Sequence, residues 1–182
     1  MSHAGVVLVG VEAAGHTAGE FDQGLGIGSV QLYLLLYAVL VIGSFGIVTV
    51  VAGDEPASLE TFRGLAKRKP LVAVAFTVFL LAQAGVPFTS GFVAKFGVIQ
   101  AAVSENSYAI AIIAMVAAVV AAFLYLRIMV SMWLHDADES AATFTVPVSA
   151  AVAIGIAVVF TIAVGRYPSW QVDLSDSVQL AR

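Results

Sequence analysis

One lysine stands out because it lies inside a long apolar stretch. Lys95 is the single charged residue in the run 70–104. A charged amine at the centre of a membrane helix costs roughly 2.5 to 3.5 kcal/mol, which a purely structural residue rarely justifies. Burial disfavours the charged form, so such an amine can gain and release a proton. We therefore predict that Lys95 transfers protons; the alternative is a lysine whose ammonium snorkels to the nearer membrane surface.

The stretch that holds this lysine cannot be one regular helix. Gly85 is flexible, Pro87 lacks a backbone donor and disfavours helical geometry just before it, and Thr89 or Ser90 could cap a new helix. We predict two half-length helices with a break at residues 85–89. Such a break at membrane depth survives only inside protein or beside water, and transporters build ion sites from interrupted helices.

Three other ionisable residues lie in or near apolar stretches. Arg127 lies seven residues before Leu134, within snorkelling distance of one membrane interface, and arginine does not lose its proton in proteins. We predict an anchor or a counter-charge there. Because histidine titrates near neutrality, His3, in the same segment as Glu12, is a second candidate for a proton path. The alternative is a histidine that is only a satisfied polar side chain.

The composition of the chain indicates a bilayer. Of its 182 residues, 60% are hydrophobic and 11% are charged, whereas a soluble domain carries about a quarter charged residues. The uncharged runs are long enough, or nearly so, to cross roughly 30 Å of hydrocarbon as helices, and they lack the alternation of a barrel. The predicted fold class is all-α: a polytopic transmembrane helix bundle with a discontinuous helix, in a single membrane domain over residues 1–182.

The expected membrane spans follow from the long apolar runs. They are residues 1–14, 29–52, 70–104 with the break, 107–134 and 145–165. The first is too short to cross a membrane, so we expect that segment to begin before this chain does, with Met1 internal to a longer protein. The loop 56–69 holds half of the basic residues, and the positive-inside tendency therefore places it in the cytoplasm.

Charge and cysteine content exclude several classes of function. The formal net charge of -4 argues against nucleic-acid partners, which require clustered basic residues. The chain has no cysteine and only three histidines, so it has neither disulfides nor thiolate-bound iron–sulfur clusters, and the histidines lack ligand-like spacing. We expect no cofactor, no metal and no redox active site on this chain.

Five stretches of the sequence together form a recognisable pattern. They are SHAGVVLVGVEAA (2–14), YAVLVIGSFGIVTVV (37–51), FRGLAKRKP (62–70), AGVPFTSGFVAKFGV (84–98) and FLYLRIMVSMW (123–133). This pattern resembles the antiporter-like membrane subunits of respiratory complex I, most closely the subunit N family of NADH-quinone oxidoreductase. The motif AGxPxTxGFxxKF is its most specific part. By this resemblance the chain looks like the C-terminal portion of such a subunit, and the N-terminal repeat of the family has no counterpart in these 182 residues.

The resemblance implies a proton-translocating subunit of a translocase in the cell membrane. In that family, quinone reduction elsewhere in the complex is coupled to proton transfer through a lysine on a discontinuous helix, and Lys95 occupies this position. In the family this lysine belongs to a half-channel that opens away from the cytoplasm, and the resemblance implies the same for Lys95. The expected partners are the other membrane subunits and the lipid bilayer. The alternatives are a subunit of a cation/proton antiporter or membrane-bound hydrogenase, and a structural membrane subunit without its own proton path.

The same resemblance bears on topology. It counts residues 70–104 as one broken pass, which places the loop after Trp133 in the cytoplasm and the C-terminus outside. Two passes would place Arg166 and Arg182 in the cytoplasm, which the positive-inside tendency mildly prefers. We follow the single broken pass.

Overall fold

The computed structural model describes the backbone of residues 2–16, 24–136 and 144–166, and the side chains of residues 4–13, 30–136 and 144–166. The helices of these ranges are α1 (Ser2–His16), α2 (Gly24–Ala52), the 3₁₀ turn η1 (Glu60–Phe62), α3 (Leu65–Arg68), α4 (Pro70–Ala84), α5 (Ser90–Ser104), α6 (Tyr108–Leu134) and α7 (Val148–Arg166). The described ranges contain helices and no strand. The predicted all-α bundle is confirmed.

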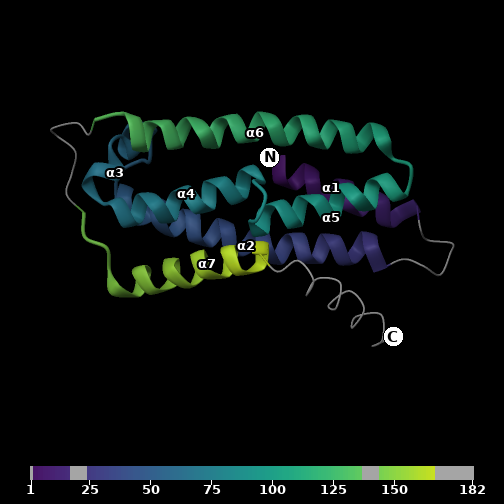
Figure 1. The fold of residues 1–182 in the computed structure, drawn as a ribbon, viewed down its shortest axis with the longest axis horizontal. Helices are drawn as coiled ribbons and strands as arrows, with labels where there is room; N and C mark the ends of the chain where they lie inside the picture. Colours follow the sequence, from purple (N-terminus) through teal and green to yellow (C-terminus); the bar gives the residue numbers. More distant parts are fainter. Residues whose placement is uncertain (1, 17–23, 137–143, 167–182) are drawn as a thin grey trace.

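The predicted discontinuous helix is present as α4 and α5. α4 ends at Ala84 and α5 begins at Ser90. Each half is about 22 Å long at 1.5 Å per residue, which is too short to cross a membrane alone. Figure 1 shows the two halves end to end, so that together they run the length of the bundle once.

The long helix α2 forms the centre of the bundle. It packs against α1, α4, α5 and α7. α6 covers α1, α4 and α5, and α7 lies beside α2 and reaches the break between α4 and α5 (Figure 1). Two clusters of buried apolar side chains divide at this break, one around Phe76 and Phe79 of α4 and the other around Val93 and Val98 of α5.

Three helices are long and apolar enough to cross a membrane. They are Val30–Ala52, Tyr108–Leu134 and Val148–Arg166. Large apolar side chains point outward from α6, among them Ile112, Val119 and Phe123. An exposed apolar surface of this extent marks a membrane or protein interface. The chain is a multi-pass membrane protein.

The loop between α2 and α4 folds onto the C-terminal end of α6. The N–H of Gly64 donates to the carbonyl of Ser131 (3.2 Å), and the Ser131 hydroxyl donates to the carbonyl of Leu59 (3.2 Å). Lys67 forms an exposed ion pair with Asp136, and the hydrogen bond from Lys67 holds the pKa of the Asp136 carboxyl below its ordinary value. These contacts fix the basic loop to one end of the bundle.

Some helix bounds differ from those expected from the sequence. The helix α2 begins at Gly24, a few residues before the expected span 29–52, while its apolar part, Val30–Ala52, agrees with that span. α7 begins at Val148, not at residue 145, since the carbonyl of Pro147 accepts the first helical hydrogen bond, from Ala151 (2.9 Å). α1 continues to His16 instead of ending at residue 14.

Candidate functional site

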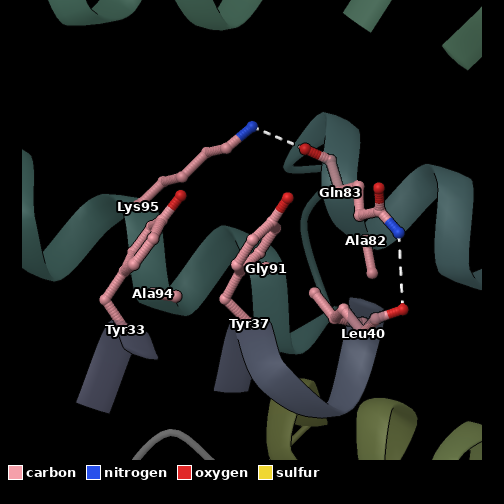
Figure 2. A pocket seen from close by; sticks show the side chains of 8 residues that line it. All are labelled: Tyr33, Tyr37, Leu40, Ala82, Gln83, Gly91, Ala94 and Lys95. Carbon is pink, nitrogen blue, oxygen red and sulfur yellow. Dashed lines mark hydrogen bonds between the residues drawn. The ribbon is translucent and has the colours of Figure 1, made fainter. Parts of the chain in front are cut away.

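Lys95 points from the middle of α5 into the break between the half-helices. Only 7% of its surface is exposed. Its Nζ donates to the carbonyl oxygens of Gln83 (2.7 Å) and Ala84 (3.1 Å), which end α4; Figure 2 shows the bond to Gln83. The amine therefore lies at the discontinuity that the sequence predicts, inside the bundle.

The end of α4 explains why carbonyl groups are available there. Gly85 has a left-handed conformation (φ 89°), which glycine adopts without steric cost. Its N–H donates to the carbonyl of Ala82 (3.0 Å), and the N–H of Val86 donates to that of Leu81 (3.1 Å). This pair of bonds is a Schellman motif, which ends a helix and satisfies two of its last four carbonyls.

The remaining two carbonyls are those that Lys95 binds. A helix leaves its last four carbonyl groups without intrahelical partners, and after the Schellman motif only those of Gln83 and Ala84 remain. The ammonium donates to both. Carbonyls at a helix C-terminus carry partial negative charge and favour a cation, whereas burial favours the neutral amine. Two opposing influences therefore act on the charge of Lys95.

The start of α5 is fixed by Thr89. Its hydroxyl accepts a hydrogen bond from the N–H of Phe92 (3.4 Å) and donates to the carbonyl of Val86 (2.6 Å). Of the two expected capping residues, Thr89 is the one that caps. Ser90 is fully buried instead, and its hydroxyl has no hydrogen-bond partner among the described residues.

Glycines allow the backbones around the break to approach each other. A Cβ at Gly91 would overlap the carbonyl of Ala82 in α4, and a Cβ at Gly165 in α7 would overlap the backbone of Phe88 and Thr89. Small residues commonly allow such close packing of membrane helices. The break is thus held between α4, α5 and α7.

Gln83 ties the last turn of α4 to α2. Its side-chain amide donates to the hydroxyl of Ser44 and to the carbonyl of Leu40 (3.4 Å), while its backbone carbonyl accepts from Lys95. Both Gln83 and Ser44 are buried. The same residue therefore holds α4 against α2 and presents an acceptor to the amine.

Replacing Gln83 by leucine is expected to destabilise the protein by about 0.5–1.5 kcal/mol, because the buried Ser44 hydroxyl loses the amide donor and keeps only its own bond to the Leu40 carbonyl. The measurement is thermal unfolding of the purified protein in detergent, with Gln100→Leu as the control, since Gln100 is exposed on the same broken helix. Equal melting temperatures of the two variants would contradict the structural role of the Gln83 amide.

A small cavity lies beside the amine. It is lined by Tyr33, Tyr37, Leu40, Ala82, Gln83, Gly91, Ala94 and Lys95, and its volume is about 10 Å³, which is close to the smallest space that holds one water molecule. The rings of Tyr33 and Tyr37 are stacked with centroids 5.8 Å apart. Figure 2 shows both hydroxyls pointing to the side of α2 on which Lys95 lies.

The tyrosines, Gln83 and the contact of Gly91 were not predicted from the sequence. A signal for the tyrosines exists, because a spacing of four residues places Tyr33 and Tyr37 on one face of a helix. Gln83 is a polar residue in an apolar helix just before the predicted break. The close approach of Gly91 to Ala82 depends on tertiary packing alone, and no local pattern indicates it.

The other candidate residues lie apart from the cavity lining. Glu12 of α1 accepts a hydrogen bond from the hydroxyl of Ser107 (2.9 Å), just before α6. Arg127 is exposed on α6. The side chain of His3 lies outside the described residues, so its expected part in a proton path stays a prediction. Among the residues that the structure describes, no three His, Cys, Asp or Glu side chains group as metal ligands would.

Comparison with known proteins decides the family. A family model described as NADH:quinone oxidoreductase/Mrp antiporter, transmembrane, matches residues 1–124. The chain belongs to this family. The matched region includes the whole broken helix, with Lys95 and both tyrosines, and the resemblance found in the sequence is confirmed.

A curated relative agrees with this assignment. NADH-quinone oxidoreductase subunit N of Rhodococcus opacus (strain B4) is 38% identical over 179 residues, which cover 97% of this chain and 32% of the relative. The chain thus spans about a third of the length of that relative.

Two solved structures share the fold. A chain of respiratory complex I from Thermus thermophilus with bound aureothin superposes with a TM-score of 0.71 at 22% identity, covering 92% of this chain and 42% of that chain. A chain of the Mrp complex from Dietzia sp. DQ12-45-1b gives a TM-score of 0.74 at 24% identity, covering 93% and 38%.

Proposed function

We propose that this chain is part of a proton-translocating subunit of an NADH-quinone oxidoreductase, and that Lys95 is the group that gains and releases the proton. The observation that carries the proposal is the position of the Lys95 amine, which is buried at the break between α4 and α5 and bound to two carbonyls. The similarity to a curated subunit N over 97% of the chain supports the choice of complex.

The mechanism follows from two opposing effects on the charge of the Lys95 amine, the cost of burial and the attraction of the carbonyls at the end of α4. In the protonated state, the ammonium caps the two remaining carbonyls of α4, and this interaction offsets part of the cost of a buried charge. Quinone reduction elsewhere in the complex changes the electric field at Lys95. The amine then releases its proton in one state of the complex and takes up another in the next state.

Electrons travel through other subunits in this proposal, so the chain contributes to the translocase without a redox site of its own. Its partners are the other membrane subunits and the lipid of the cell membrane. The basic loop fixed to the end of α6 faces the cytoplasm, as the positive-inside tendency favours. A cysteine-accessibility probe near Arg182 tests this orientation, because the single broken pass places the C-terminus outside.

The proposal is tested by NADH-driven proton uptake in inverted membrane vesicles that carry Lys95→Met in this chain. Loss of proton uptake with the complex still assembled is expected. A wild-type number of protons per NADH oxidised in that variant would contradict the proposal.

The second candidate is a subunit of a cation/proton antiporter. The likeness in fold to a chain of the Mrp complex favours it, and the family model names both kinds of protein. Sodium-dependent proton movement in vesicles without NADH oxidation would support the antiporter. Proton uptake that requires NADH and ignores sodium would support the oxidoreductase.

A further inference from the structure

We propose that the outward face of α6 docks against a transmembrane helix of a neighbouring subunit, and that this helix carries an aspartate or glutamate that pairs with Arg127. From the proposed function the inference takes only that the chain lies among other membrane subunits, and it does not depend on the role of Lys95. The observation that carries it is Arg127 itself, a charged side chain exposed on an otherwise apolar helix face.

The outward face of α6 is the least covered apolar surface of the three long helices. Only 17% of the most apolar stretch of α6 is buried, compared with 33% for α2 and 28% for α7. Small residues such as Ala111, Ala114 and Ala121 turn inward, and Figure 1 shows α6 along one edge of the bundle. Large exposed apolar side chains surround Arg127 within two helical turns: Val120, Phe123, Leu124, Val130 and Leu134.

Arg127 lies well inside the apolar part of α6. It is seven residues before the end of the helix at Leu134, which is roughly 10 Å at 1.5 Å per residue. The polar boundary follows directly, since Asp136 just beyond the helix pairs with Lys67. The Cα–Cβ bond of a helical residue tilts toward the N-terminus, so the Arg127 side chain starts out toward the membrane centre. Snorkelling to the nearer surface therefore requires the side chain to fold back along the helix.

The described part of the chain supplies no partner for this guanidinium. No hydrogen bond or ion pair joins Arg127 to another residue that the structure describes, whereas Lys95 on α5 is buried and donates to two carbonyls. Ionisable side chains within membrane helices almost always face protein or water and pair with one another. Arginine keeps its proton, and its planar fork matches a carboxylate. The expected partner is therefore a carboxylate at a similar depth on a neighbouring helix.

The opposite edge of the bundle lacks such a charge. Helix α7 exposes Val152, Ile156 and Val159, and its sequence holds one charged residue, Arg166, which ends the helix. An apolar face without an embedded charge is suited to lipid chains, because it leaves no polar group unsatisfied. The embedded charge of Arg127 thus distinguishes the face of α6 as a protein interface.

The test measures the intact complex in membranes that carry Arg127→Leu. A native gel in mild detergent, stained for NADH oxidation, reports the full-size complex, and an immunoblot of the membranes reports this chain. We expect about tenfold less intact complex or lower, because truncating one member of a buried charge pair leaves the other unpaired. The chain itself should stay in the membrane. Arg127→Lys should keep part of the complex, since the charge remains but the fork is lost.

Arg166→Leu is the matched control, because it makes the same substitution at the exposed end of α7, and it should leave the amount of complex unchanged. Wild-type amounts of complex with Arg127→Leu would overturn the proposal and assign this face to lipid. If Arg127→Leu removes the chain itself from the membrane, Arg127→Gln decides by the same two measurements.

Second-site suppression identifies the partner. In the Arg127→Leu background, replacing the matching aspartate by asparagine, or glutamate by glutamine, in a membrane helix of a neighbouring subunit should restore the complex, because no unpaired charge is left. Suppressors that never remove a carboxylate, or that all lie in the same polypeptide as Arg127, would overturn the proposal. Normal pumping by Lys95→Met would overturn the proposed function and leave this result unchanged.

Discussion

Vesicles that carry Lys95→Met are expected to show normal amounts of assembled complex and a rate of proton transfer through this chain that is lower by on the order of 10²-fold. Methionine is unbranched and flexible, so it can fill the space of the lysine stem. The proton-accepting nitrogen is gone, and a thioether cannot replace it. Dye quenching reports proton uptake, and ferricyanide reduction by NADH reports the assembled electron-input part.

The Lys95→Met variant should still assemble, because two opposing contributions to its stability are similar in size. Removing the amine leaves the carbonyls of Gln83 and Ala84 without their donor. This costs about 1–3 kcal/mol for the buried Gln83 carbonyl and less for the partly buried carbonyl of Ala84, which water can reach. Removing a charge from membrane depth recovers roughly 2.5 to 3.5 kcal/mol. The contributions nearly cancel. A variant that loses assembly before it loses pumping would instead indicate the structural role considered for this lysine.

Lys95→Arg separates the charge of the residue from its proton exchange. Arginine can cap the same carbonyls and keep the positive charge, but it does not release its proton. We expect the complex with Lys95→Arg to assemble and to take up protons more slowly than the wild type. Lys67→Met is the control for both variants, because Lys67 is an exposed lysine in an ion pair at the end of the bundle, and it should pump at the wild-type rate.

The break and its lysine could be predicted because their signals are local. Gly85 and Pro87 disturb a helix through their own backbone chemistry, whatever surrounds them. Lys95 is conspicuous because a single charge in an apolar run is costly in any membrane protein. Both predictions depend only on a few neighbouring residues and on the presence of a bilayer, which the apolar composition of the chain indicates.

The partners of the lysine could not be predicted in the same way. Which carbonyls the ammonium binds depends on the Schellman motif that leaves those of Gln83 and Ala84 free. Which face of α2 meets the amine depends on how α2 packs against α5. A tyrosine pair in a uniformly apolar helix gives no amphipathic pattern to orient it, because such a helix is hydrophobic all round.

The alanine variant of Gly91 is expected to disrupt the site more than any other small substitution in the broken helix. Its methyl group would overlap the backbone carbonyl of Ala82, and backbone cannot move aside as a flexible side chain can. α5 must shift away from α4, which separates Lys95 from its two carbonyl acceptors.

Overpacking a well-packed region costs typically about 1–3 kcal/mol, occasionally more, and here the strain falls on the helix break itself. Gly155→Ala is the matched control, because it makes the same change in α7 where nothing lies within 4 Å, and alanine favours a helix by about 1 kcal/mol over glycine. Thermal unfolding in detergent should therefore move in opposite directions for the two variants. A Gly91→Ala protein as stable as the wild type would mean that α4 and α5 do not approach each other this closely, and that the carbonyls do not hold the amine as described.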